Sequence, residues 1–154
     1  MSMSGRCIRR RSAPAVIRGL PPVHPIPIRA IRRLLACLRR RGILSGRVNL
    51  LYVDRRAMRA LNRSHTGGRY DTDVLSFPWH GEDGLQGEIA VSVDRAAAEA
   101  RRRGYPASRE ILLYTLHGIL HLAGYDDVTP RKAVRMRRAE DCILEELGVR
   151  VDPR

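Results

Sequence analysis

After about residue 27, apolar positions recur at every third or fourth residue in some segments and at every second residue in others. The first period is typical of an amphipathic helix and the second of a half-buried strand. Helices are predicted at residues 28–41, 54–61, 94–103, 109–123 and 130–147, and strands at residues 47–53, 73–79 and 87–93. This order of elements, without strict alternation of strand and helix, indicates an α+β fold with a small mixed sheet covered by about five helices.

Capping and turn residues mark the ends of these elements. N-caps are expected at Asp54, Asp94, Ser108 and Thr129, and helix-ending glycines at Gly42, Gly104 and Gly148. Residues 62–72 are polar and glycine-containing, which predicts a loop. Strands 73–79 and 87–93 are separated by a short polar segment, which favours a hairpin. Pro78 has no N–H group, so the first hairpin strand should end at a sheet edge or at a bulge.

Residues 1–27 mix Arg, Ser and Pro without any helical or strand period. We interpret them as a basic tail that precedes a single domain at residues 28–154. The chain has no apolar run long enough to cross a bilayer and no apolar block typical of a secretory signal. The first fifty residues also have the acid-free character of an organelle transit peptide. Because residues 28–41 have the pattern of a domain helix, a cytoplasmic location is the preferred interpretation.

The formal charge of +13 is concentrated in the first third of the chain. Of the 29 basic residues, 12 are arginines before Asp54, where no acidic residue occurs, so the rest of the chain has 17 basic against 16 acidic residues. Attraction to a polyanion such as RNA would therefore originate mainly in this part. Coding bias is the alternative, since Lys132 is the only lysine. Three cysteines without CxxC spacing, Cys7, Cys37 and Cys142, argue against disulfides and a thiolate zinc site.

Two histidines near the end of predicted helix 109–123 carry the most specific chemical signal. His117 and His121 are four residues apart, so both rings project from one face of the helix. Gly124 can adopt a positive φ angle and reverse the chain, which brings Asp126 or Asp127 back toward the rings. Two imidazoles and one carboxylate are ligands that zinc accepts, with a fourth position open for a water whose pKa the metal lowers to about 7. A coincidental histidine pair is the alternative, which the offsets of Gly124 and Asp127 disfavour.

The segment LHGILHLAGYDD, residues 116–127, resembles the signature HGxLHLxGYDH of the YbeY family of metal-dependent endoribonucleases, also called rRNA maturation factors. Residues 61–78, LNRSHTGGRYDTDVLSFP, resemble the family block LNxxYRxxDxPTDVLSFP, and residues 87–96, GEIAVSVDRA, resemble its GDIxIS segment. The resemblance implies a single-strand-specific RNase with a single α+β domain related in shape to zinc peptidases. It further implies a role in rRNA maturation and ribosome quality control, with RNA and the small ribosomal subunit as partners.

The metal ligands of the family are three histidines. Carried over to this sequence, they fall on His117, His121 and Asp127, so the resemblance implies one zinc ion with a carboxylate as its third ligand. Carboxylate oxygen is a competent zinc ligand, and metal binding should survive the replacement. Asp126 is the rival ligand, and its alternative role is to cap a helix or to support the ligands by a hydrogen bond.

A second departure from the family concerns charge beside the substrate. The arginine of the family's YR pair falls on Thr66, which has no charge to offer a phosphate. Arg63 or Arg69 could reach the same space from the predicted loop. The simpler interpretation is that both are solvated loop arginines without a role in catalysis. Arg69 and Asp126 are therefore the candidate catalytic residues. For Glu110, seven residues before His117, a structural hydrogen bond is the preferred role.

Two other functions remain to be weighed. The spacing of His117, His121, Gly124 and Asp127 also resembles the metzincin peptidase pattern HExxHxxGxxH. Gly118 speaks against a peptidase, because it occupies the position of the glutamate that serves there as general base. RNA, in contrast, has a 2′-hydroxyl that can act as an internal nucleophile. The second alternative is a non-catalytic ribosome- or RNA-binding protein with structural zinc, which would show no metal-dependent cleavage.

Overall fold

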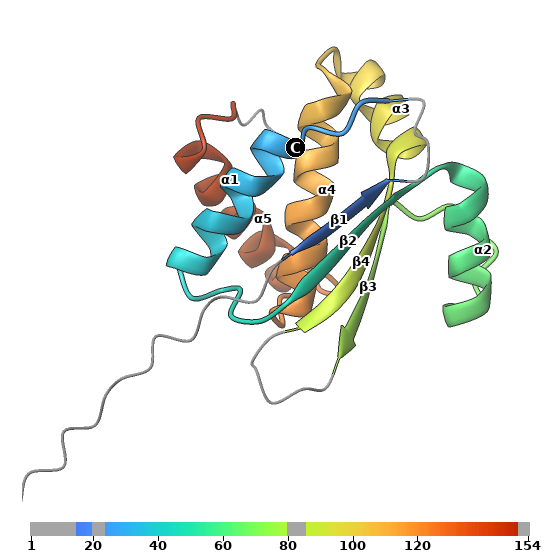
Figure 1. Ribbon diagram of the computed structural model, residues 1–154, viewed down its shortest axis with the longest axis horizontal. Coiled ribbons are helices and arrows are strands. Elements are labelled where there is room, and N and C mark those ends of the chain that lie inside the picture. The colour runs from blue at the N-terminus through green and yellow to red at the C-terminus, as the bar shows by residue number, and fades with distance from the viewer. Residues whose placement is uncertain (1–14, 20–23, 80–85, 151–154) are drawn as a thin grey trace, which may run out of the picture.

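The computed structural model describes residues 15–19, 24–79 and 86–150 of the chain. Within these residues it contains a four-stranded sheet of order β1-β2-β4-β3 (Figure 1). The strands are β1 (Val16–Gly19), β2 (Val48–Val53), β3 (Val74–Trp79) and β4 (Gln86–Ser92). β1, β2 and β4 are parallel, whereas β3 runs antiparallel to β4. The sheet is therefore mixed, as the sequence predicts.

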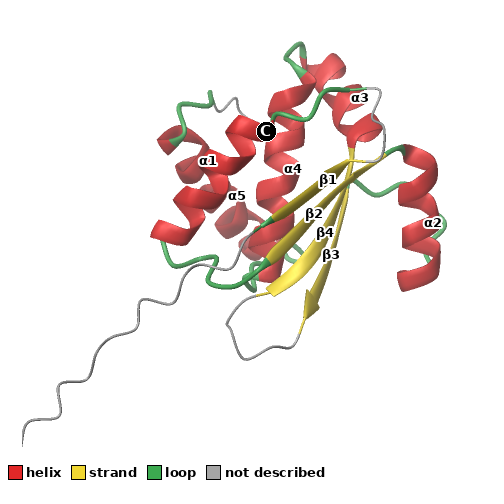
Figure 2. Ribbon diagram, in the orientation of Figure 1, coloured by secondary structure: helices red, strands yellow, loops and turns green. Residues whose placement is uncertain are grey.

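Five helices lie in the described part of the chain, on both faces of this sheet. They are α1 (Ile28–Arg40), α2 (Arg55–Thr66), α3 (Val93–Arg103), α4 (Ala107–Leu122) and α5 (Pro130–Glu146). α1, α4 and α5 lie on one side of the sheet and α2 on the other (Figure 2). The predicted α+β fold is confirmed. None of these helices is long and apolar enough to span a membrane.

The main core lies between the sheet and α4. Leu50 and Tyr52 of β2 and Ile89 of β4 are buried, and they belong to one apolar cluster with side chains of α1, α4 and α5. The buried Tyr52 hydroxyl satisfies its hydrogen bond with Thr115 Oγ1 of α4 at 2.9 Å. Burial on nearly all sides explains why α4 is apolar around most of its circumference. The helix that carries the histidines is thus anchored in the core.

One part of the predicted tail is a strand, and the sequence interpretation is wrong there. β1 pairs in parallel with β2, with Val16 opposite Asn49 and Gly19 opposite Tyr52. A segment of four residues is too short to show the alternation of apolar and polar positions that is typical of a strand, and this one lies between prolines. The strand forms because its main chain hydrogen-bonds to the edge of β2, and the side-chain pattern does not predict this pairing. Residues 1–14 and 20–23 of the predicted tail lie outside the described residues, and the domain boundary at residue 28 stays a prediction.

Helix ends differ from the sequence interpretation where local capping rules compete with tertiary contacts. α2 continues to Thr66 instead of ending near Leu61, because the buried Asn62 donates from Nδ2 to the Tyr70 carbonyl (3.0 Å) and so holds the last turn against the following loop. Ser92, rather than Asp94, caps α3. α4 begins after Pro106 without a side-chain cap, which places Ser108 inside its first turn.

Other predicted ends are confirmed. Asp54 accepts a hydrogen bond from the Ala57 N–H at the start of α2, and Thr129 accepts one from the Lys132 N–H at the start of α5. β3 is an edge strand, so the missing N–H group of Pro78 costs little there.

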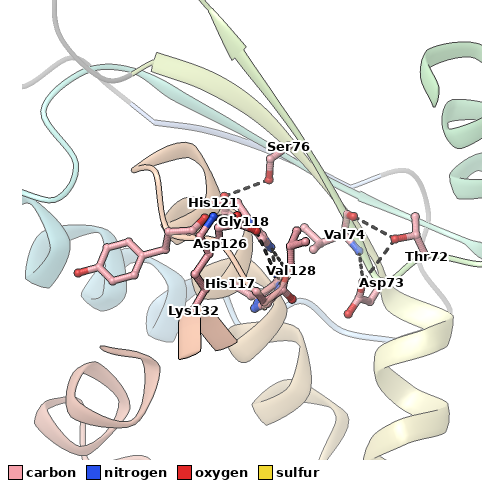
Figure 3. Close-up of polar contacts among 12 residues, drawn as sticks. Thr72, Asp73, Val74, Ser76, His117, Gly118, His121, Asp126, Val128 and Lys132 are labelled. Carbon is pink, nitrogen blue, oxygen red and sulfur yellow. Dashed lines mark hydrogen bonds and ion pairs between the residues drawn. The ribbon is translucent and has the colours of Figure 1, made fainter. Parts of the chain in front are cut away.

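Gly118 allows α4 to approach the sheet closely. A Cβ atom at this position would lie 2.6 Å from Ile89 Cγ2 and 2.8 Å from Val74 Cγ2. Both neighbours are β-branched and have little rotamer freedom to move away. On the same side of the helix, Ser76 Oγ of β3 donates to the Gly118 carbonyl at 3.0 Å (Figure 3).

Gly118→Ala is therefore expected to destabilise the protein, although alanine is the better helix former by about 1 kcal/mol. Overpacking a well-filled core costs about 1–3 kcal/mol, and the rigid neighbours place this site toward the upper end. Urea unfolding should give a net loss of about 1–2 kcal/mol. Ser108→Ala on the exposed first turn of α4 is the control and should change stability by less than about 0.5 kcal/mol. Equal stability of Gly118→Ala and the wild type would contradict the close packing.

Candidate metal centre

The end of α4 and the turn after it bring three potential ligands together. His117 and His121 lie one helical turn apart, and α4 ends at Leu122. Gly124 has a φ angle of 91°, and the Tyr125 N–H bonds back to the Leu120 carbonyl at 2.9 Å. This left-handed glycine closes the helix and turns the chain back, as the sequence predicts.

Each imidazole is held by its Nδ1 atom. Glu140 Oε1 of α5 lies 2.7 Å from His117 Nδ1, and the Tyr125 carbonyl lies 3.1 Å from His121 Nδ1. A carboxylate and a carbonyl both accept hydrogen bonds, so each Nδ1 carries the hydrogen of a neutral imidazole. The lone pair is then on Nε2 of each ring. Such partners fix the tautomer and the orientation of metal-binding histidines.

The free Nε2 atoms converge with the carboxylate of Asp127. His117 Nε2 and His121 Nε2 are 3.0 Å apart, and the oxygens of Asp127 lie 3.8 Å from the first and 3.9 Å from the second. Ligand atoms about 2.1 Å from a tetrahedral zinc ion are roughly 3.4 Å apart. Two lone pairs and a carboxylate this close repel one another unless a metal ion lies between them or the two Nε2 atoms share a proton. His117, His121 and Asp127 thus form a donor set that fits one divalent ion.

The electrostatic surroundings of His117 also favour positive charge. Burial of the ring works to lower the pKa of His117, but the hydrogen bond to Glu140 and the charges of Glu140, Asp73 and Asp127 outweigh it. The pKa of His117 is therefore raised above its ordinary value. The same negative groups would stabilise a bound cation, because the interaction does not depend on whether the positive charge is a proton or a metal ion.

Asp126, the rival ligand, is turned away from the histidines. Its Oδ1 accepts from the Val128 N–H at 3.1 Å, and its Oδ2 forms an ion pair with Lys132 at 2.7 Å (Figure 3). These contacts, the Lys132 hydrogen bond first, lower the pKa of Asp126. Both carboxylate oxygens are engaged by the turn before α5 and by Lys132, while Thr129 caps the helix, and this favours Asp127 as the third ligand.

Two pockets meet at the candidate metal centre. The first, of about 440 Å³, lies between β3 and the ligand set and is lined by Ser76, Pro78 and all three ligands, among others. The second, of about 530 Å³, extends from His117 toward α3 and the start of α4. His117 and Asp73 line both pockets. Both volumes are in the range of ordinary ligand-binding clefts. His117 is thus reached from both pockets, whereas His121 and Asp127 belong to the lining of the first.

The candidates for the missing loop charge are not brought to this place. Arg69 is exposed in the turn after α2, and it lines neither of the two pockets at the metal centre. Thr66 stabilises the end of α2. Its Oγ1 donates to the Asn62 carbonyl at 2.9 Å and accepts from the Gly68 N–H at 3.1 Å. The structure thus gives no support to Arg69 as a catalytic residue.

Sequence reasoning missed the part that Glu140 plays at the centre. Glu140 is buried with 3% relative exposure and contacts a ligand directly from another helix. An acidic side chain on the apolar side of the helix predicted at residues 130–147 was the available signal. Glu110 also lies in the second pocket, where it accepts a hydrogen bond from the Tyr105 hydroxyl. The structural role expected for Glu110 agrees with this contact.

Comparison with known proteins gives a consistent result. A sequence model of the family described as Endoribonuclease YbeY matches residues 29–148. Proteins named Endoribonuclease YbeY from Chlorobium phaeovibrioides and Chlorobium luteolum are 39% and 30% identical, covering 68% and 81% of this chain and 70% and 96% of their own lengths. The solution structure of TM1509 from Thermotoga maritima has a TM-score of 0.60 and 27% identity, over 87% of this chain and 91% of that one. The chain therefore belongs to the Endoribonuclease YbeY family.

Proposed function

We propose that this protein is a zinc-dependent, single-strand-specific endoribonuclease that acts in rRNA maturation and ribosome quality control in the cytoplasm. The observation that carries the metal dependence is the convergence of His117, His121 and Asp127, whose ligand atoms all lie within 4.8 Å of one another. The assignment to RNA comes from the family. The small ribosomal subunit as partner and the role in quality control follow from the family resemblance in the sequence.

The chain's own groups have separable tasks in this proposal. His117, His121 and Asp127 would hold the ion, while Glu140 and the Tyr125 carbonyl orient the two rings. When bound, zinc would supply Lewis acidity, which activates water and neutralises charge on a phosphate. The pocket between β3 and the ligand set would take the nucleotide at the scissile bond.

The peptidase alternative loses support at Gly118. A side chain at this position would run into Ile89 and Val74 of the sheet. The position that holds the general base in metzincins thus has neither a carboxylate nor room for one here. RNA cleavage does not have this requirement if the 2′-hydroxyl is the nucleophile. Products ending in a 2′,3′-cyclic phosphate would identify that route.

The test is metal analysis of the purified protein combined with a cleavage assay on unstructured RNA. The proposal expects about one zinc per chain, loss of cleavage after treatment with a chelator, and recovery when zinc is added back. A duplex of the same sequence should resist cleavage. A protein that binds the RNA but shows no metal-dependent cleavage would instead support the non-catalytic binding function.

The two adjacent aspartates offer a matched pair of variants. Asp127→Asn should lower zinc affinity about 10- to 100-fold, because an amide oxygen is a weaker ligand than a carboxylate. Asp126→Asn, which loses the Lys132 ion pair instead, should leave zinc affinity nearly unchanged. Asp127→His, which restores the residue implied by the family resemblance, should retain zinc. Competition titration with a chromophoric chelator measures all three. A larger loss in Asp126→Asn than in Asp127→Asn would reverse the ligand assignment.

A further inference from the structure

Four arginines line the second pocket at the metal centre. Its lining includes Arg55 at the start of α2 and Arg95, Arg102 and Arg103 of α3. The pocket also contains His117, so its inner end is formed by a residue of the metal centre itself. α3 and α4 are consecutive in the chain, and α3 lies next to α4 at the upper end of the sheet (Figure 1). The arginines therefore line a pocket that also contains His117.

The four arginines are matched in number by four carboxylates of the lining, Asp73, Glu99, Glu110 and Glu140, so a site for an anion depends on how these charges are paired. Glu110 and Glu140 are buried, with 2% and 3% relative exposure, and they bond the Tyr105 hydroxyl and His117. Glu99 is shared by Arg102 and Arg103. One carboxylate therefore faces two guanidinium groups. The hydrogen bond from Arg102, followed by that from Arg103, lowers the pKa of Glu99 to about 2.

Arg95 is the arginine best placed to receive an anion. Its Nη1 donates to the main-chain carbonyl of Asp71 at 3.3 Å, and no carboxylate among the described residues forms an ion pair with it. Asp71 lies two residues before Asp73, which lines both pockets beside His117. The contact therefore holds the Arg95 side chain against the segment before β3, in a pocket that also contains His117, with the other N–H groups of its guanidinium available.

We propose that this arginine pocket is a phosphate-binding subsite for the RNA chain beyond the scissile nucleotide, with Arg95 as its main contact and Arg102 as a second one. The proposal rests on the proposed function. Guanidinium groups bind phosphate oxygens through paired, charge-assisted hydrogen bonds. This subsite supplies from α3 the positive charge that Thr66 does not supply from the loop after α2. It contributes to affinity for longer RNA and is not part of the bond-breaking step.

The experiment compares Arg95→Gln and Arg102→Gln with the wild type on short and long oligouridylates. Arg32→Gln, an exposed arginine on α1 that lines neither pocket, is the control. For long RNA, KM should rise roughly 5-fold in each subsite variant with kcat nearly constant. The slope of log affinity against log salt should fall by about 0.7 for each lost phosphate contact. Cleavage of the shortest substrate should be unchanged in both variants, because that substrate does not reach the subsite.

Other outcomes overturn the subsite. The subsite proposal would be wrong if the wild-type protein preferred long RNA no more than short RNA. It would also be wrong if the Arg32→Gln variant showed the same rise in KM as the subsite variants. An equal loss of kcat on all substrates would mean that the arginines act only by supporting the metal centre. Fluorescence anisotropy with the same oligonucleotides measures binding without cleavage. The subsite can therefore be tested even if the wild type cleaves no RNA, which would contradict the proposed function and not the subsite.

Discussion

Replacing His121 with alanine is expected to abolish zinc binding and to lower the rate of RNA cleavage by at least about 100-fold. The variant removes one of two imidazole nitrogens that lie 3.0 Å apart, and the remaining pair of ligands cannot hold the ion tightly. His121 is partly exposed at the end of α4, so the loss of its ring leaves no large cavity. The zinc-to-protein ratio and the initial rate of cleavage of unstructured RNA measure the two effects.

His65→Ala is the control for this prediction. His65 is exposed on α2, where Nδ1 contacts the Leu61 carbonyl, and it lines neither pocket at the metal centre. The control should keep both zinc and activity. Unfolding of the metal-free wild type and of His121→Ala at the same temperature would show that the variant is folded. Full zinc content or full activity in His121→Ala would exclude the proposed centre.

The ligand set was predictable because its geometry is local. Residues four apart on a helix share a face, and a glycine just beyond the helix end reverses the chain. These two rules bring His117, His121 and a following aspartate together without any knowledge of the tertiary structure. They do not separate Asp126 from Asp127. That distinction depends on contacts of Asp126, whose two oxygens are engaged by the Val128 N–H and by Lys132.

The surroundings of the ligands were not predictable in the same way. Glu140 is 23 residues from His117, and the two meet only because α5 packs against α4. The arginine pocket combines α2, α3 and α4, so no sequence window contains it. β1 was missed for a related reason, because main-chain pairing with β2 defines it and side-chain periodicity does not. Contacts between distant segments are invisible to rules based on spacing.

Capping rules failed at the two helices that lead into the site. Both Ser92 and Asp94 stand near the start of α3, and a sequence rule cannot rank them. The helix begins earlier because Val93 belongs to the core, so Ser92 becomes the cap. Ser108 has the right residue type for α4, yet the helix starts one residue before it. These shifts change the helix ends and leave the spacing of His117, His121 and Asp127 unaffected, so the three side chains still come together.

Glu140→Gln is the second variant with a large expected effect. It preserves the shape of a buried side chain but removes the negative charge 2.7 Å from His117 Nδ1. A carboxylate at this position makes the opposite ring nitrogen a stronger ligand, and its loss typically costs 10–100-fold in metal affinity. We expect zinc affinity to fall by about this factor, with cleavage largely recovered at saturating zinc. Chelator competition, at a pH well above the pKa of an imidazole so that protons do not compete, measures the affinity.

Glu110→Gln is a closely matched control for this variant. Glu110 is as buried as Glu140 and lines the same pocket, but its hydrogen bond goes to Tyr105 and not to a ligand. If Glu140 acts through His117, the control should keep its zinc affinity even if both variants lose stability. If buried negative charge near the centre is all that matters, the two variants should lose zinc affinity alike. Equal losses would therefore refute an orienting role for Glu140, whereas a selective loss would show that the hydrogen bond to His117 tunes the ligand.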